Sequence, residues 1–216
     1  MNGYEVWFEG FIVFAAIIGL ITHSGILKKK FRVNLFLYYT NLSNLLVLLF
    51  FSCRVVVTFL GIQSGFLYQV VYSEFWHFSI TASILITFLI YHFLLAPLVK
   101  KGDIGSAEFK HHSFDNIAVH YVVPILTLLD WLFIASKSNL NWMSGVYWIV
   151  IPLAYTLFAL LRGMLGGNIK YTTSPYPYPF MDPAEKGWMK VMLNLFYMSI
   201  GFVVLGMMMV GIGGIL

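Results

Sequence analysis

Charged residues are scarce in this chain. Only 10% of its 216 residues are Asp, Glu, Lys or Arg, and 60% are hydrophobic. An average soluble domain carries roughly 25% charged residues, which keep its surface solvated. The composition therefore excludes an ordinary soluble domain and indicates a protein whose outer surface contacts lipid.

Motifs for several common chemistries are also missing. The single cysteine, Cys53, excludes an internal disulfide and any cysteine-rich metal or redox motif. The chain contains no H-E-x-x-H, G-x-S-x-G or glycine-rich phosphate-binding sequence. A retinal protein would need a lysine within an apolar segment, and none is present. We therefore expect no metal and no cofactor, and the alternative left open is a haem between His92 and either His120 or His23.

What the chain has instead is a set of six long apolar runs. A helix needs about 20 mostly apolar residues to cross a hydrocarbon core about 30 Å thick. The strands of a barrel would alternate between apolar and polar residues over about 10 positions, and this alternation is absent. We predict an all-α, polytopic membrane protein in which residues 1–216 form a single bundle of six transmembrane helices. The predicted spans are 6–27, 34–60, 75–98, 116–136, 142–165 and 189–213.

The basic residues, which give a formal net charge of +4, lie on one side of the predicted bundle. Only Lys137 lies in a connection on the opposite side. Cytoplasmic loops of membrane proteins are enriched in Lys and Arg, so both termini are predicted to be non-cytoplasmic. This one-sided distribution explains the positive charge without a nucleic-acid partner. The predicted cytoplasmic connections contain Lys28, Lys29, Lys30, Arg32, Lys100, Lys101, Lys110, Arg162, Lys170, Lys186 and Lys190.

The longest connection follows the fifth span and is rich in tyrosine and proline. Its prolines prevent a regular helix and favour extended or turn conformations. We predict a re-entrant or surface-lying cap over residues 171–188, with an aromatic belt at the membrane interface as the alternative interpretation. The candidate cap or pocket residues are His92, from the third span, together with Arg162, Tyr176, Tyr178 and Asp182.

Polar residues within the spans are informative because they are costly in hydrocarbon and usually face the bundle interior. At 100° per residue, those of the second span follow one helix face from end to end. Arg54 and Asp130 lie too deep to reach water, so we predict structural ion pairs, either with each other or between Arg54 and Glu9 or Glu74. The polar residues of the second span are Thr40, Asn41, Ser43, Asn44, Arg54 and Thr58.

His120 in the fourth span is predicted to lie at the same depth as Thr40. Both spans begin at the predicted cytoplasmic face, and the two residues lie roughly 6 to 9 Å inside them at 1.5 Å per residue. Pro124 lacks the N–H that would bond to the carbonyl of His120, which predicts a kink and a small polar pocket beside the imidazole.

A hydroxyl beside a neutral imidazole is the minimum that nucleophilic catalysis requires. Thr40 is therefore a candidate nucleophile and His120 a candidate base. The structural interpretation is that Thr40 bonds to the carbonyl of Phe36 one turn back, and that His120 makes an interhelical hydrogen bond. The candidate supporting or oxyanion-stabilising residues are Asn41, Asn44 and Ser43.

Four blocks of sequence, in this order and spacing, resemble the androgen-induced-gene superfamily, and more closely its bacterial six-span relatives of mostly unassigned function. The similarity covers the second to fifth spans and the cap. Animal members are intramembrane threonine hydrolases that cleave fatty acid esters of hydroxy fatty acids, and the resemblance implies the nucleophile and base roles for Thr40 and His120. The blocks are Tyr39-Thr40-Asn41-Leu42-Ser43-Asn44, His120-Tyr121-Val122-Val123-Pro124, Arg162-Gly163 and Tyr176-Pro177-Tyr178-Pro179-Phe180.

These observations lead to the hypothesis of an intramembrane hydrolase of lipid esters in a bacterial cytoplasmic membrane, with membrane lipids as environment and substrate. A small-solute transporter or channel, lined by the polar face of the second span, is one alternative, and a non-catalytic membrane scaffold is another. The residue that would orient His120 stays open among Asp115, Asn116, His92 and the tyrosines of the third span.

Overall fold

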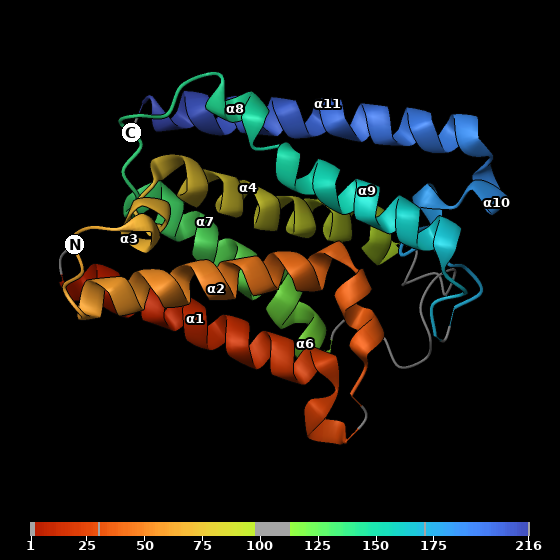
Figure 1. Ribbon diagram of the computed structural model, residues 1–216, viewed down its shortest axis with the longest axis horizontal. Coiled ribbons are helices and arrows are strands. Elements are labelled where there is room, and N and C mark those ends of the chain that lie inside the picture. Colours follow the sequence, from red (N-terminus) through yellow and green to blue (C-terminus); the bar gives the residue numbers. More distant parts are fainter. Residues whose placement is uncertain (1–2, 30, 98–112, 171, 216) are drawn as a thin grey trace.

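The chain folds into a bundle in which six helices are long and apolar enough to cross a membrane. The computed structural model describes residues 3–29, 31–97, 113–170 and 172–215 (Figure 1). The predicted all-α, multi-pass architecture is confirmed, and the protein is an integral membrane protein. The six spans are Gly3–Ser24, Tyr39–Phe59, Glu74–Leu95, Phe114–Phe133, Ser144–Leu165 and Trp188–Gly213.

Three spans are single α-helices, and three are assembled from shorter elements. The first, second and sixth spans are α1, α2 and α11, with the bounds given above. Both ends of the described chain lie at the same end of the bundle, as six crossings require (Figure 1). The composite spans join α4 (Glu74–Ile90) to η3 (Tyr91–Leu95), α6 (Phe114–Ile117) and η4 (Ala118–Val122) to α7 (Val123–Phe133), and α8 (Ser144–Tyr147) to α9 (Val150–Leu165).

The second span begins later than the apolar run predicts. A 3-10 helix, η2 (Val33–Leu37), precedes it, and Tyr38 is extended with φ −93° and ψ 139°. Two side chains use the carbonyls of η2 and so hold this break: Asn41 Nδ2 donates to Leu35 O, and Tyr155 Oη donates to Leu37 O. The predicted start near residue 34 is therefore corrected to Tyr39.

Two apolar cores fill the bundle. One lies between α1, α2, α4 and α7 and includes Ile12, Val47, Phe51, Ile84 and Val123. The other joins α4 and α7 to α8, α9, α11 and the connection before α11, and includes Phe78, Trp131, Trp148, Tyr178 and Met209. In Figure 1, α8, α9 and α11 form a layer on the face of α4 that is turned away from α1 and α2.

Helix α11 is the most peripheral span: 17% of its most apolar stretch is buried, against 56% in the third span. It is anchored by a close approach to α8. A methyl group at Gly206 would overlap the indole of Trp148 and the carbonyl oxygen of Gly145. Close packing therefore explains Gly206, whereas the space beside Gly201 is open.

Candidate functional site

Thr40 and His120 lie side by side in the bundle interior. Thr40 Oγ1 is 3.3 Å from His120 Nε2, and the two residues are only 7% and 6% exposed. Thr40 occupies the first turn of α2, and His120 lies in the middle of η4. The predicted common depth of the two side chains thus corresponds to direct contact.

The contacts of the imidazole define which nitrogen carries hydrogen. His120 Nδ1 lies 3.0 Å from the carbonyl oxygen of Asn116. A carbonyl only accepts, so Nδ1 is the donor, and in a neutral ring Nε2 then presents its lone pair to Thr40. The Thr40 hydroxyl consequently donates to His120. It does not bond to Phe36, because the extended residue Tyr38 separates α2 from the preceding turn.

A π-helical turn carries His120 to this position. Residues Ala118–Val122 form the π-helix η4, and Val123 N–H bonds to Ala118 O across one more residue than in an α-helix. Pro124 follows directly and cannot donate to His120 O, in agreement with the distortion predicted there. π-helical turns often occur at functional sites, since the extra residue redirects side chains.

The third span supports the imidazole from its other side through a second π-helical turn, η3. The ring of Tyr91 stacks on His120, with centroids 3.8 Å apart and planes inclined by 28°. Asn116 Nδ2 donates to Tyr91 Oη, while the Asn116 carbonyl accepts from His120. Among the open candidates for orienting His120, the structure thus brings Asn116 and Tyr91 into contact with it.

Asn44 and Ser43, which were predicted to support the site, donate hydrogen bonds to backbone carbonyls. Asn44 Nδ2 donates to Thr40 O at 2.7 Å and to Val119 O at 3.0 Å, which ties α2 to η4. Ser43 Oγ also donates to Thr40 O and contacts Thr87 Oγ1 at 2.8 Å. Both amide hydrogens of Asn44 are thereby used.

Asn41 connects the site to α1. Its Nδ2 donates to Leu35 O, so its Oδ1 is the acceptor for His23 Nδ1 at 2.8 Å. The imidazoles of His23 and His120 meet edge to face, with centroids 6.1 Å apart. His23 is a buried neighbour of the site that spacing within one helix could not identify, because it comes from another span.

The connection before α11 packs onto α9 as a folded cap, within which η5 (Pro179–Met181) and α10 (Pro183–Lys186) are the regular elements. Arg162 Nη1 donates to the carbonyls of Gly167 and Pro175, each at 2.7 Å. The Tyr176 ring lies where a side chain at Gly163 would be. Asp182 accepts from Ala184 N–H and so begins α10.

Tyr178 is the cap residue that reaches the nucleophile. Its hydroxyl accepts from Tyr39 N–H at 3.0 Å, and its single hydrogen lies within reach of the side chains of Thr40 and Tyr155. Burial raises the pKa of Tyr178 to about 12, although these hydrogen bonds act in the opposite direction. The phenol is therefore neutral and carries its hydrogen beside Thr40 at physiological pH.

A pocket that is partly open to its surroundings begins at Thr40 and lies between α2, α4, α9, the cap and α11. Along α4 it extends from Leu95 to Ile86, about 14 Å at 1.5 Å per residue. Its far end is lined by apolar residues such as Pro152 and Phe202. Thr40 thus presents one side to the pocket and the other to His120.

His92 is the candidate that the structure places elsewhere. It is exposed on the outer surface, where Nδ1 lies 3.2 Å from Tyr121 Oη, and it does not line the pocket. Its position on the third span is one residue away from Tyr91, and this difference of about 100° around the helix turns it outward.

In the described part of the chain, no group of three or more His, Cys, Asp or Glu side chains is arranged to hold a metal ion. Comparison of the whole sequence with protein-family models, with curated proteins and with solved structures gave no match. The site's own geometry is therefore the basis for assigning its chemistry.

Proposed function

We propose that the protein is an intramembrane hydrolase of lipid esters, in which Thr40 is the nucleophile and His120 the general base. The observation that carries this proposal is the arrangement of His120, with Nδ1–H on a backbone carbonyl and Nε2 facing the Thr40 hydroxyl. A buried nucleophile, a base in the correct tautomer and a group that orients the base are the elements of nucleophilic hydrolysis. The resemblance to threonine hydrolases of the androgen-induced-gene superfamily supports the same roles.

In the proposed reaction, Thr40 Oγ1 attacks the ester carbonyl carbon while its proton passes to His120 Nε2. The tetrahedral intermediate then expels the alcohol, which takes the proton from His120, and an acyl-threonine ester remains. Water attacks this ester while His120 accepts its proton, the bond between the acyl carbon and Thr40 Oγ1 breaks, and His120 returns the proton to Oγ1. Each cycle consumes one ester and one water molecule and yields one alcohol and one free fatty acid.

The negatively charged oxygen of the tetrahedral intermediate needs hydrogen-bond donors next to Thr40. We assign this role to the Tyr178 hydroxyl, which lines the pocket and hydrogen-bonds to Thr40. The first turn of α2 adds the positive end of a helix dipole. Asn44, with both amide hydrogens on carbonyls, is instead assigned the positioning of Thr40 against η4.

The pocket favours a lipid as substrate. Because the pocket is mostly apolar and lies among transmembrane helices, it would hold an acyl chain along α4, with the ester carbonyl at Thr40. Fatty acid esters of hydroxy fatty acids are the specific class that the superfamily resemblance suggests. A bacterial cytoplasmic membrane is the proposed location on the same basis.

The test uses purified protein in detergent, an octanoyl ester as substrate and a fluorophosphonate as covalent probe. Thr40→Ala removes the attacking oxygen, so we expect both hydrolysis and labelling to fall to background. His120→Ala should lower the rate of hydrolysis roughly 100- to 10,000-fold, as loss of a general base does. Mass spectrometry should place the probe on the peptide that contains Thr40.

Thr156→Ala is the matched control, because Thr156 lines the same pocket but its hydroxyl bonds to Pro152 O within α9. This variant should keep both activities. Labelling that persists in Thr40→Ala would remove the assignment, and solute flux by the wild type in liposomes without any ester hydrolysis would favour a transporter.

A further inference from the structure

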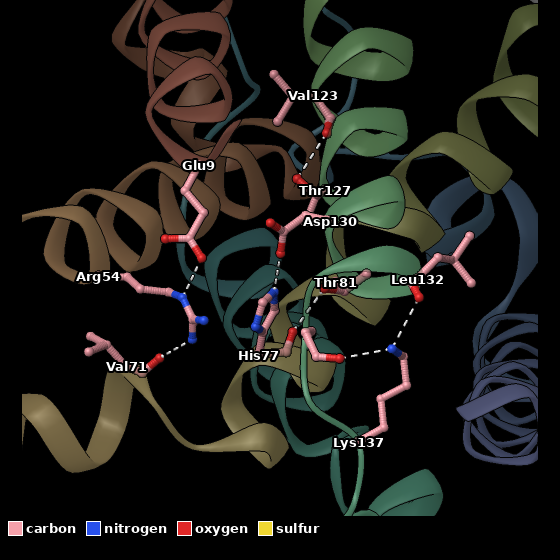
Figure 2. A network of polar contacts seen from close by, with 11 residues as sticks. Glu9, Arg54, Val71, His77, Thr81, Val123, Thr127, Asp130, Leu132 and Lys137 are labelled. Carbon is pink, nitrogen blue, oxygen red and sulfur yellow. Dashed lines mark hydrogen bonds and ion pairs between the residues drawn. The ribbon is translucent and has the colours of Figure 1, made fainter. Parts of the chain in front are cut away.

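A second group of buried ionisable side chains lies at the other end of the bundle from Thr40. Helices α1, α2, α4 and α7 each contribute one residue, and Figure 2 shows how these lie. Along α2, Arg54 is about 21 Å from Thr40 at 1.5 Å per residue. Ionisable groups at such depth are costly and are usually functional. The residues, here called the buried cluster, are Glu9, Arg54, His77 and Asp130, with exposed fractions of 0%, 7%, 2% and 0%.

The buried cluster consists of two interacting pairs. Arg54 Nε lies 2.5 Å from Glu9 Oε1, and Arg54 Nη1 also donates to Val71 O. His77 Nε2 lies 2.7 Å from Asp130 Oδ2. The two pairs also interact electrostatically with each other, Asp130 with Glu9 and Arg54 with His77 (Figure 2).

The charges of the cluster do not balance without an added proton. Arg54 is always positive, and two ionised carboxylates with a neutral His77 leave a net charge of −1. An uncompensated charge in a buried site costs several kcal/mol. A proton on any one of Glu9, His77 or Asp130 brings the sum to zero. We propose that the buried cluster is a binding site for one exchangeable proton, shared among these three side chains.

Unsatisfied oxygens in the cluster support this assignment independently of the charge count. Glu9 Oε2 and Asp130 Oδ1 are buried and have no hydrogen-bond partner among the described residues. Buried carboxylate oxygens normally accept hydrogen bonds, so such atoms indicate a site for a proton or another ligand. The rings of Phe50 and Phe51 lie 5.4 Å from the His77 imidazole and cover it with apolar surface.

The other charged and titratable groups around the cluster do not supply the missing charge. The Tyr72 ring lies against Arg54, 5.0 Å from its guanidinium carbon. Glu5 in the first turn of α1 adds further negative charge near Glu9. At the edge of the bundle, Lys137 interacts with Asp130 and also with Glu74, whose negative charge offsets that of the lysine, and both Lys137 and Glu74 are only partly buried.

The test is thermal unfolding of the purified protein from about pH 7.5 to about pH 9, above the pKa of about 6.5 of an unfolded histidine. In this range the unfolded residues of the cluster carry no extra proton while the folded cluster holds one. Stability should therefore fall as pH rises. Asp130→Asn and Glu9→Gln each make the cluster neutral without a proton, so both should abolish this slope. His77→Gln leaves the charge unbalanced and should retain it.

Glu185→Gln is the control, because Glu185 is an exposed carboxylate whose replacement should leave the slope unchanged. A wild-type stability that is flat over this range would overturn the proposal. So would a slope that survives in both carboxylate variants, or one that follows sodium concentration rather than pH.

Infrared absorption provides a second measurement if a variant does not fold. The wild type should show the band of a protonated carboxylic acid or of an imidazolium, which persists while the stability falls with pH and disappears at the pH above which the stability no longer changes. Absence of any such titration would contradict the proposal. None of these results depends on Thr40, so failure of the hydrolase assignment would be distinguished from failure of this one.

Discussion

The hydroxyl of Tyr178 accepts a hydrogen bond from the N–H of Tyr39, the residue that precedes the nucleophile, at 3.0 Å. The two residues are separated by 139 positions in the chain. This contact joins the cap to the first turn of α2. The proposed catalytic site is therefore complete only while the cap is packed against the bundle.

Tyr178→Phe should lower kcat for ester hydrolysis about 100-fold, because it removes the proposed oxyanion donor but keeps the ring. Tyr176→Phe is the matched control from the same cap. The ring of Tyr176 packs against Gly163, and removal of its hydroxyl should leave kcat unchanged. Steady-state kinetics with the octanoyl ester would show the difference. Equal rates for Tyr178→Phe and the wild type would exclude the donor role.

The contribution of Tyr178 should persist to unusually high pH. Burial raises its pKa to about 12, so the phenol keeps the hydrogen that it donates well above pH 10, where a solvated tyrosine loses it. The ratio of the wild-type rate to that of Tyr178→Phe, after subtraction of spontaneous hydrolysis, should stay constant up to about pH 11. A ratio that declines from about pH 9 would indicate a solvated phenol.

Gly163→Ala should displace the cap, because the added methyl group would overlap the Tyr176 ring. We expect reduced hydrolysis and faster proteolysis of the connection, with a loss of roughly 1–3 kcal/mol in stability from overpacking. Gly167→Ala, at a position with open space, is the control and should behave as the wild type. Unchanged proteolysis in Gly163→Ala would show that the cap tolerates this displacement.

Gly206→Ala should loosen the packing of α11 on α8, because its methyl group would overlap Trp148 and the Gly145 carbonyl. Thermal unfolding in detergent should show a loss of roughly 1–3 kcal/mol. Gly201→Ala, on the same helix but facing open space, should cause no loss. If both variants unfold at the same temperature, the close approach does not contribute to stability.

The sequence predicted the six spans and the common depth of Thr40 and His120, because apolar length and helical rise are local properties. It did not predict the break at Tyr38. That break depends on Asn41 and on the distant Tyr155, which use carbonyls that a longer helix would need for itself. An apolar run predicts a continuous helix and does not show that side chains compete for its backbone carbonyls.

Partners across helices were predicted less completely. Glu9 was one of three candidates for Arg54, whereas the contact between His77 and Asp130 was not expected. The rotation and order of helices within a bundle decide which polar faces meet, and neither follows from the period of one helix. Tyr91 was among the open candidates for orienting His120, but the sequence did not select it from the others, for the same reason.

The late start of α2 has a consequence for the supply of water. In the proposed reaction, water must reach the acyl-threonine to release the fatty acid, and hydrocarbon offers none. Thr40 is the second residue of α2, so the covalent intermediate would form within the first turn of this span. The acyl chain would remain in the apolar pocket, while the ester bond to be hydrolysed would lie near the interface between membrane and water. The first turn of α2 would thus lie between the lipid, which holds the ester, and the aqueous phase, which supplies the water.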